Sequence, residues 1–399
     1  MKFSMNSAVS PSVTVILPTF NRAHLIAESV DSLLAQTWPI KEIIIVDDGS
    51  TDQTDRVVAA YEGQVHCLKK ANGGKLSALN VGLSQATGDL VWIMDDDDIA
   101  PSNALENLIA PFLEDGNTNI SYGALRKFTV DSRTGEKEYL KTFPYPPEDE
   151  RSFFVRVLED CFITGQPCLL VRKACYDAIY PLPEHVTVSE DYAVLIDLAR
   201  LYDARRIEAV TLLQRQHEGP RGPGDIRYAA DTRYARWCEA DTNLMKGILP
   251  TLSLEELGGD DRNPRNVRRA LFQKAVIAAR KKLWPSAIEA LDEAVKADPM
   301  SPLEPLEKKI LGGMLGCRYG LDELMDCPDW MDRVREALAP LNDRNEALSR
   351  IAGMLPYRIR IRLMERDFRR AGAYWRLFWR LAGIRLGVRT GVSKLIGAA

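Results

Sequence analysis

The chain has 399 residues, 46% of them hydrophobic, which is long enough for two or three domains with buried cores. Seven cysteines without a Cys-x-x-Cys pair exclude a disulfide framework and argue against a zinc site, so reduced thiols are expected. The net charge of −4 hides a strong asymmetry. Residues 357–399 hold ten Arg and one Lys against two acids, a balance of +9 that leaves −13 for the preceding residues.

No segment predicts a membrane span or an export signal. The longest apolar runs fall short of the roughly 18 residues that a transmembrane helix needs. The first eleven residues are polar and lack the apolar core of a signal peptide. The expected location is therefore the cytoplasm.

Short apolar runs alternate with helical patterns over the first hundred residues. Strands are predicted at 13–17, 42–46, 64–68 and 90–94, and helices at 25–34, after residue 52 and at 75–85. Ser50 or Thr51 is expected to cap the second of these helices. This alternation predicts an α/β fold with a doubly wound, mostly parallel sheet.

A polar motif follows each predicted strand and falls at the same edge of the sheet, where open α/β sheets bind ligands. The motifs are residues 18–22, 47–50, 72–75 and Asp95 to Asp98. Four adjacent carboxylates repel one another unless a cation lies between them, and Mg²⁺ or Mn²⁺ is the natural candidate. An acidic, solvated turn is the alternative for the last motif alone. Four converging motifs are harder to explain as turns.

In order and spacing the motifs resemble those of family 2 glycosyltransferases of the GT-A fold. The similarity is carried by the Pro-Thr-Phe-Asn-Arg, Asp-Asp-Gly-Ser and Gly-Lys-Leu-Ser-Ala-Leu-Asn segments, by the four aspartates, by Ser-Glu-Asp-Tyr and by a closing strand before His217, over about residues 11–222. Two positions depart from the family pattern. Phe20 replaces the usual Tyr, and Asp96 replaces a small residue, which leaves the metal ligands open among Asp95, Asp96 and Asp97.

The resemblance implies an inverting, metal-dependent transfer of a sugar from a nucleotide-sugar, expected to be a UDP-sugar, to a hydroxyl acceptor during synthesis of a cell-surface glycan. It implies that Asp97 and Asp95 bind Mn²⁺ or Mg²⁺, with His217 as an additional ligand. Asp191 is expected to be the general base, and Glu190 is expected to bind the acceptor or to support the loop. Asp47 is expected to accept a hydrogen bond from uracil. The full donor site is expected to comprise Pro18, Thr19, Asn21, Arg22, Asp47, Asp48, Gly74, Lys75, Asn80, Asp95, Asp96 and Arg221.

Purely structural roles remain open for several of these residues. Pro18 and Asn21 can shape a turn, and a lone histidine such as His217 is more often structural than a ligand. Asp98 is expected to cap the helix after Pro101 and Ser102. Residues 189–191 can form the capped start of a helix at 192–201, which does not conflict with catalysis.

The second half of the chain is predicted to be helical. Residues 274–299 resemble one tetratricopeptide-type hairpin, a unit that is stable only in stacks. The predicted domains are a GT-A catalytic domain at 11–222, a helical region at 223–340 and a basic amphipathic tail at 341–399. A β-hairpin is predicted where residues 128–130 and 138–140 flank a turn.

The tail combines arginines with an apolar stripe. This pattern favours a helix lying on an anionic membrane surface through residues 357–399, which suits peripheral attachment to the inner face of the membrane and a glycan or lipid-linked acceptor. Packing of the stripe on the protein itself or on another copy is the alternative, and a homo-oligomer stays open. Nothing resembles a nucleic-acid-binding module. The stripe consists of Ile361, Met364, Phe368, Ala371, Trp375, Phe378 and Ala382.

Two rival functions are weighed against sugar transfer. The first is a non-catalytic scaffold protein for glycan assembly that works through the helical half, and the intact acidic motifs argue against it. The second is nucleotidyl transfer on a similar sheet, which the Glu190-Asp191 pair makes less fitting.

Overall fold

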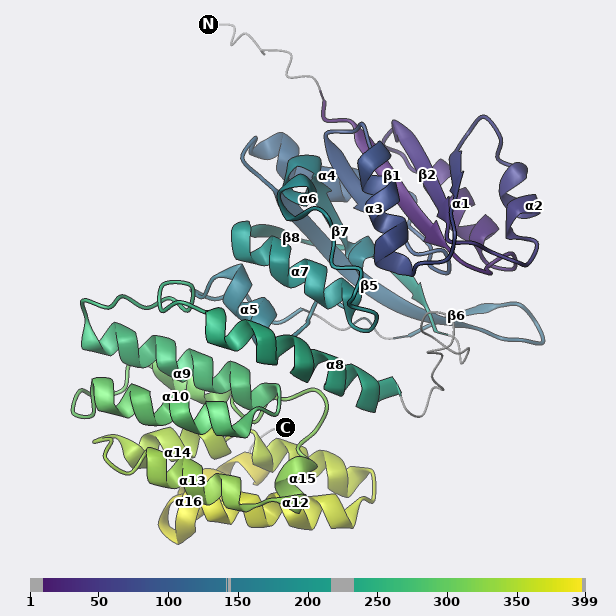
Figure 1. Cartoon of the computed structure of the whole chain (residues 1–399). Helices are drawn as coiled ribbons and strands as arrows, with labels where there is room; N and C mark the ends of the chain where they lie inside the picture. The colour runs from purple at the N-terminus through teal and green to yellow at the C-terminus, as the bar shows by residue number, and fades with distance from the viewer. Residues whose placement is uncertain (1–9, 141, 143–144, 217–232, 397–399) are drawn as a thin grey trace, which may run out of the picture. The chain divides into compact units, whose positions relative to one another are not determined.

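The computed structural model describes residues 10–140, 142, 145–216 and 233–396 (Figure 1). Residue contacts divide the chain into two compact units. The first comprises Met1–Val157 and Cys161–Arg233, and the second comprises Leu158–Asp160 and Tyr234–Ala399. The boundary predicted at residue 222 lies outside the described residues.

The described part of the first unit is built on an eight-stranded sheet with the order β3-β2-β1-β4-β7-β5-β6, and β8 pairs with β5. Its strands are β1 (Val13–Thr19), β2 (Glu42–Asp47), β3 (His66–Lys69), β4 (Leu90–Ile93), β5 (Ile120–Val130), β6 (Lys137–Tyr139), β7 (Leu169–Arg172) and β8 (Ala204–Arg215). Its helices are α1 (Ile26–Leu34), α2 (Thr54–Ala59), α3 (Lys75–Gln85), α4 (Ala104–Glu114), α5 (Phe153–Glu159), α6 (Lys173–Ile179) and α7 (Glu190–Leu201), with the last two residues of α5 assigned to the second unit.

The first four strands run parallel, as the alternation of strands and helices predicts. The other half of the sheet is mixed: β7 pairs antiparallel with both β4 and β5, while β8 is parallel to β5. The predicted hairpin is confirmed, since β6 pairs antiparallel with the end of β5. The fold is thus an α/β fold with a mostly parallel, mixed sheet.

Burial explains the composition of the central strands. Every residue of β1 and β4 is buried, and so is every residue of β2 after Glu42. Strands covered on both faces need apolar side chains at successive positions, which is why they read as continuous Val, Ile and Leu runs. Helix α3 packs on β1 and β2, and α4 packs on β5, β7 and β8.

A glycine brings α3 close to the sheet. A Cβ atom at Gly82 would lie only 2.5 Å from Ile16 Cγ2, so no larger residue fits without displacing the strand or the helix. This close packing holds the first residue of α3, Lys75, at the edge of the sheet where the parallel strands end.

The predicted cap of α2 is wrong. The helix begins at Thr54, whose N–H donates to Asp52 Oδ1 at 2.9 Å. Ser50 and Thr51 are not available because they bind the loop after β1. Ser50 Oγ accepts from Asn21 N at 2.9 Å, and Thr51 N donates to Asn21 Oδ1 at 2.8 Å.

The second unit is helical throughout its described part. Its helices are α8 (Arg233–Ile248), α9 (Pro264–Arg280), α10 (Trp284–Ala297), α11 (Pro305–Gly312), α12 (Glu323–Asp326), α13 (Asp329–Ala337), α14 (Arg344–Ala352), α15 (Leu355–Met364) and α16 (Phe368–Ile396). Helices α9 and α10 pack together over the segment that resembles a tetratricopeptide hairpin.

The tail does not form the separate region predicted from residue 341. Helix α16 packs against α13, α14 and α15, and it buries Tyr374, Phe378 and Leu381 to within 1% exposure. These apolar side chains complete the core of the second unit, so the tail belongs to that unit. No helix in the described ranges combines the length and apolar character needed to cross a membrane.

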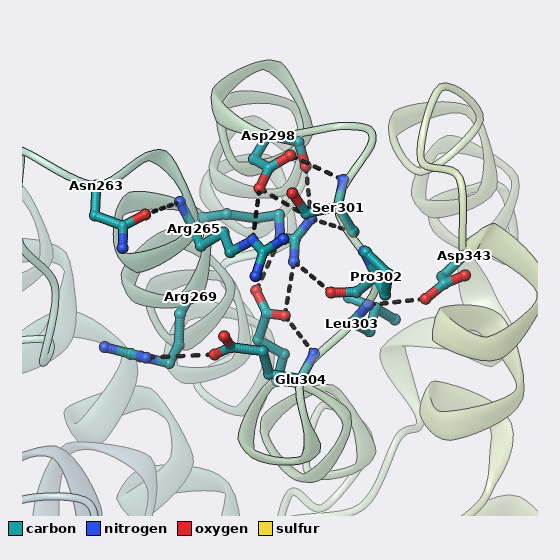
Figure 2. A network of polar contacts seen from close by, with 11 residues as sticks. Asn263, Arg265, Arg269, Asp298, Ser301, Pro302, Leu303, Glu304 and Asp343 are labelled. Atoms are coloured by element: carbon teal, nitrogen blue, oxygen red, sulfur yellow. Dashed lines mark hydrogen bonds and ion pairs between the residues drawn. The ribbon is translucent and has the colours of Figure 1, made fainter.

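A fully buried guanidinium organises the loop between α10 and α11. Arg268 is 0% exposed and donates to both carboxylate oxygens of Glu307 at 2.8 Å. It also donates to the backbone carbonyls of Asp298, Ser301 and Pro302, three residues of the loop that Figure 2 labels. A buried charge is tolerated when every donor finds an acceptor, and this network achieves that.

Candidate active site

Three segments that are distant in sequence meet at the edge where the parallel strands end. Lys75 opens α3, Asp95 follows β4 by two residues, and Asp191 lies in the first turn of α7. The Lys75 Nζ atom lies 2.7 Å from Asp95 Oδ1 and 2.9 Å from Asp191 Oδ1. One ammonium group therefore joins the carboxylate predicted on the donor side to the carboxylate predicted to be the base.

The cluster is enclosed but accessible, since the side chains of Lys75, Asp95 and Asp191 are 22%, 24% and 29% exposed. Burial alone would lower the pKa of Lys75, but the charges of Asp191 and Asp95 raise it well above its usual value. Burial raises the pKa of Asp95, against the opposing effect of Lys75. The site thus favours a cation between carboxylate oxygens, the property that a divalent metal site requires.

Glu190 directly precedes Asp191 in the first turn of α7. Burial, and next the charge of Asp191, raise the pKa of Glu190 to about 7. Glu190 therefore keeps a proton over part of the neutral range and can donate a hydrogen bond. The preceding residue, Ser189, occupies the N-cap position with φ 59°, but its side chain makes no capping bond to α7.

Asp96, the residue that departs from the family pattern, is paired with the loop after β1. Its Oδ1 lies 3.5 Å from Arg22 Nε, and the Thr19 hydroxyl is also beside it. Burial and the charge of Asp97 raise the pKa of Asp96 to about 7 despite Arg22. This pairing leaves Asp95 and Asp97 as the more accessible pair of carboxylates for a metal ion.

The two acidic residues at the end of β2, Asp47 and Asp48, have structural partners. Asp47 is 2% exposed, and its Oδ1 accepts from Ser50 N at 2.8 Å. Asp48 accepts from Gly73 N at 3.0 Å and from Gly74 N at 2.7 Å, and it pairs with Lys70 at 2.7 Å. The Asp48 carboxylate thereby fixes the glycine loop that leads into Lys75.

Gly74 itself has φ 89° with open space where a Cβ atom would lie. This left-handed conformation, unfavourable for other residues, lets the chain turn directly from the loop into α3. The position of Lys75 thus depends on both the glycine and the Asp48 carboxylate.

The side-chain amides of Asn21 and Asn80 also form hydrogen bonds to other loops of the chain. Asn21 lies at φ 54° and its Oδ1 accepts from the N–H groups of the loop after β2, which ties the two loops together. Asn80 is 6% exposed; its amide accepts from Leu182 N at 2.8 Å and donates to Glu184 at 2.8 Å. Asn80 therefore positions the segment that leads to Asp191. Pro18 and Thr19 end β1 beside these loops.

The predicted cap role of Asp98 is wrong. Helix α4 starts at Ala104 with Asn103 as its N-cap, whereas Asp98 is 2% exposed and accepts from Arg215 N at 2.8 Å. Asp98 lies too deep to reach the helix because it pairs with β8.

Arg215 is a site residue that sequence reasoning missed. Its Nε donates to the Asp97 carbonyl at 2.9 Å, and its guanidinium pairs with Glu28 and lies 4.8 Å from the centre of the Phe128 ring. Arg215 thus holds the four consecutive aspartates, residues 95–98, against the end of β8. The signal that the sequence offered for Arg215 is its place in the closing strand before His217.

Two predicted ligands, His217 and Arg221, lie outside the described residues. Within the described ranges, no group of three His, Cys, Asp or Glu side chains is arranged to hold a metal ion by itself. The acidic residues of the site still suit a divalent cation, because their ligand atoms are carboxylate oxygens. Two of them, Asp95 and Asp191, already hold the ammonium group of Lys75 between them.

The sheet gathers its carboxylates where the parallel strands end, which is the edge at which open α/β sheets bind ligands. Residues 14–177 match the family model described as Glycosyl transferase family 2. This part of the chain belongs to that family.

Curated relatives share this domain over part of their length. An uncharacterized glycosyltransferase of Rickettsia felis is 28% identical over 210 residues, which are 52% of this chain and 34% of the relative. Glycosyltransferase GlyG of Streptococcus pneumoniae is 38% identical over 104 residues, 25% of this chain and 35% of GlyG. The chain thus spans about a third of the length of these relatives.

Among solved structures, S. aureus TarS 1-349 in complex with UDP-GlcNAc is similar with a TM-score of 0.47 and 18% identity, covering 85% of this chain and 90% of that one. The mannosyltransferase PcManGT of Pyrobaculum calidifontis, in complex with GDP-Man and Mn²⁺, has a TM-score of 0.45 and 20% identity. It covers 84% of this chain and 88% of that chain.

Proposed function

We propose that this protein transfers a sugar from a nucleotide-sugar, with a UDP-sugar as the expected donor, to a hydroxyl group of a glycan or lipid-linked acceptor. The observation that carries the proposal is the contact of Lys75 with both Asp95 and Asp191. A glycosyl transfer needs positive charge near the departing diphosphate and a base near the acceptor. Lys75 would provide the charge and Asp191 the base, and the two side chains are in contact.

On the donor side, Asp95 and Asp97 would hold Mn²⁺ or Mg²⁺, which supplies positive charge against the leaving diphosphate. Lys75 supplies a second positive charge from the start of α3. Asp47 is proposed to accept a hydrogen bond from the uracil N–H edge, and Arg22 to face the phosphates. The loops fixed by Asp48 and Asn21 hold these groups in place before the donor arrives.

On the acceptor side, Asp191 is proposed to take the proton of the attacking hydroxyl. One base opposite the leaving group leads to a single displacement that inverts the anomeric carbon. Glu190, protonated over part of the neutral range, would donate a hydrogen bond to the acceptor or hold the loop. The Asn80 amide, which binds the segment before α7, is a positioning group for both.

The proposed role is synthesis of a cell-surface glycan at the inner face of the membrane. The support comes from the +9 balance of residues 357–399, which would hold the enzyme near anionic lipids and a lipid-linked acceptor.

The decisive test is calorimetric titration of UDP into the full chain with and without Mn²⁺, with GDP and dTDP as controls. We expect metal-dependent UDP binding that is lost in Asp97→Ala. The matched control is Asp203→Ala, which removes an exposed carboxylate of the same unit and should bind UDP like the parent chain.

Absence of binding by every nucleotide would refute the transferase proposal. It would turn attention to the helical unit as a scaffold for glycan assembly. Binding that is equal in Asp97→Ala and the parent chain would instead refute the metal assignment and leave the nucleotide site standing.

A further inference from the structure

The structure divides the apolar stripe of the tail into two parts. Ala371, Phe378 and Ala382 are buried in the second unit, whereas Met364 and Phe368 are 72% and 68% exposed. A helix that lay along a membrane surface would need one continuous apolar face. The buried part of the stripe is already used by the core, so only the exposed part is free for a partner.

Trp375 of the stripe is 41% exposed, but the most exposed side chains lie where α15 turns into α16, at residues 363–369, hereafter the α15–α16 turn. Leu363 is 47% exposed in addition to Met364 and Phe368, so three large apolar side chains face solvent within six consecutive residues. Single exposed apolar residues are ordinary, but a contiguous group marks an interaction surface.

The turn also carries positive charge that its own acids do not cancel. Glu365 is paired with Arg362 at 2.6 Å. Asp367 is paired with Arg370 at 3.1 Å, and Arg370 also pairs with Asp322 at 2.8 Å. Arg366 and Arg369 are exposed, and neither forms an ion pair with a described residue. With Asp322 included, four arginines face three acids, and the turn presents apolar side chains flanked by two arginines without an ion pair to a described residue.

We propose that the α15–α16 turn inserts into the headgroup region of an anionic bilayer. In that arrangement Met364 and Phe368 enter the acyl boundary while Arg366 and Arg369 contact lipid phosphates. This narrows the membrane attachment proposed above from residues 357–399 to one turn of the second unit.

Size and charge favour a bilayer over a protein partner. A stable protein interface buries about 800 Å² on each side, which three side chains on a short turn cannot supply. A bilayer accepts such a protrusion without a complementary surface. The residues before 357 carry −13, so an anionic surface repels them and attracts the arginine-rich tail.

Replacement of Arg366 by glycine tests the role of its charge with little effect on the fold. Arg366 follows the C-cap residue of α15, Glu365, and has φ 59°, a conformation in which glycine is the common residue and a larger side chain is disfavoured. Arg366→Gly therefore removes the charge without a conformational penalty, and the variant should fold at least as well as the parent chain.

The experiment is co-sedimentation of the full chain with vesicles of phosphatidylcholine alone and with vesicles in which phosphatidylglycerol replaces part of it. We expect binding only to the anionic vesicles. Arg366→Gly should weaken it about fivefold and Phe368→Ser about tenfold or more. The control Met300→Ser changes a side chain that is 71% exposed elsewhere in the same unit and should leave binding unchanged.

Three results would overturn the proposal. They are equal binding to both kinds of vesicle, unchanged binding in Arg366→Gly and Phe368→Ser, and dissociation of a homo-oligomer by these variants without an effect on vesicle binding. The assay needs no nucleotide, so its failure is separate from failure of the UDP titration.

Discussion

At the scale of single residues, Lys75 defines the candidate site. It reaches Asp191, which is 116 positions away in the sequence, and Asp95 at the same time. A cation is disfavoured at a helix N-terminus, where the helix dipole is positive, so the two carboxylates compensate for an unfavourable position. Lys75 thereby keeps the proposed base next to the proposed donor site before any substrate binds.

Replacement of the proposed base separates binding from chemistry. In Asp191→Asn the shape and the hydrogen-bonding reach are kept, but the side chain no longer accepts the acceptor's proton. We expect sugar transfer, measured as UDP release with a competent donor, to fall about 10²–10⁴-fold, while the Kd for UDP stays the same.

Asp203→Asn is the control for this variant, because it alters an exposed carboxylate just after the C-terminal end of α7 and should leave transfer unaffected. Full activity in Asp191→Asn would assign the base to another residue.

Glu190 predicts a pH dependence of stability. Its pKa rises from 4.5 to about 7 on folding, because burial and the charge of Asp191 disfavour its ionised form. Between these values the folded chain binds a proton that the unfolded chain has lost, so its contribution to stability falls as the pH rises through about 7. Gln does not titrate, so Glu190→Gln should gain stability over the parent chain as the pH rises.

The measurement is the Tm of both proteins, with a chelator present, from about pH 4 to about pH 8. The advantage of Glu190→Gln should be smallest at the acid end. The control Glu208→Gln, at a side chain that is 84% exposed, should follow the parent chain at every pH. Parallel curves for Glu190→Gln and the parent chain would contradict the raised pKa.

At the scale of elements, the charged residues of the candidate site lie at the N-termini of two helices. Helices α3 and α7 start at the same sheet edge and bring Lys75, Glu190 and Asp191 there. Strand β7 enters antiparallel beside β4, and β8 clamps the acidic run through Arg215. The site is therefore built by packing of elements from the whole first unit.

In the second unit, α9 is held to the α10–α11 loop by a buried charge. Arg268→Leu would leave Glu307 ionised without its partner and three backbone carbonyls without donors. We expect a loss of about 3–5 kcal/mol in the free energy of unfolding, measured by urea titration of the helical signal.

Arg265→Leu on the same helix is the matched control, because its side chain is 47% exposed and should change stability by only about 0.5 kcal/mol. Glu307→Gln removes the uncompensated charge, so the double variant with Arg268→Leu should recover part of the loss. Equal effects of Arg268→Leu and Arg265→Leu would show that the buried network contributes no more than a surface pair.

At the scale of the whole molecule, the chain combines two units of different character. The first holds the sheet and the family 2 domain, and the second is a set of helices with its own buried core. The small net charge is the sum of an acidic portion and a basic tail of opposite sign. That separation, rather than the net value, governs which surfaces the protein approaches.

The sequence alone determined the alternating elements of the first unit and the motifs that follow them. Strands and helices leave local periodicities of two and 3.6 residues, and each motif directly follows its strand. The parallel half of the sheet, the hairpin of β5 and β6 and the family were therefore predictable.

Only the tertiary structure decided which charged groups meet. The bridge from Lys75 to Asp191, the partner of Asp98 and the buried Arg268 depend on long-range packing that no local pattern records. The tail shows the same limit: its stripe predicts an amphipathic helix, but the surface that covers it depends on the neighbouring helices. Those helices bury Phe378 and leave Phe368 in solvent, because a helix in a core is buried only where a neighbour reaches it.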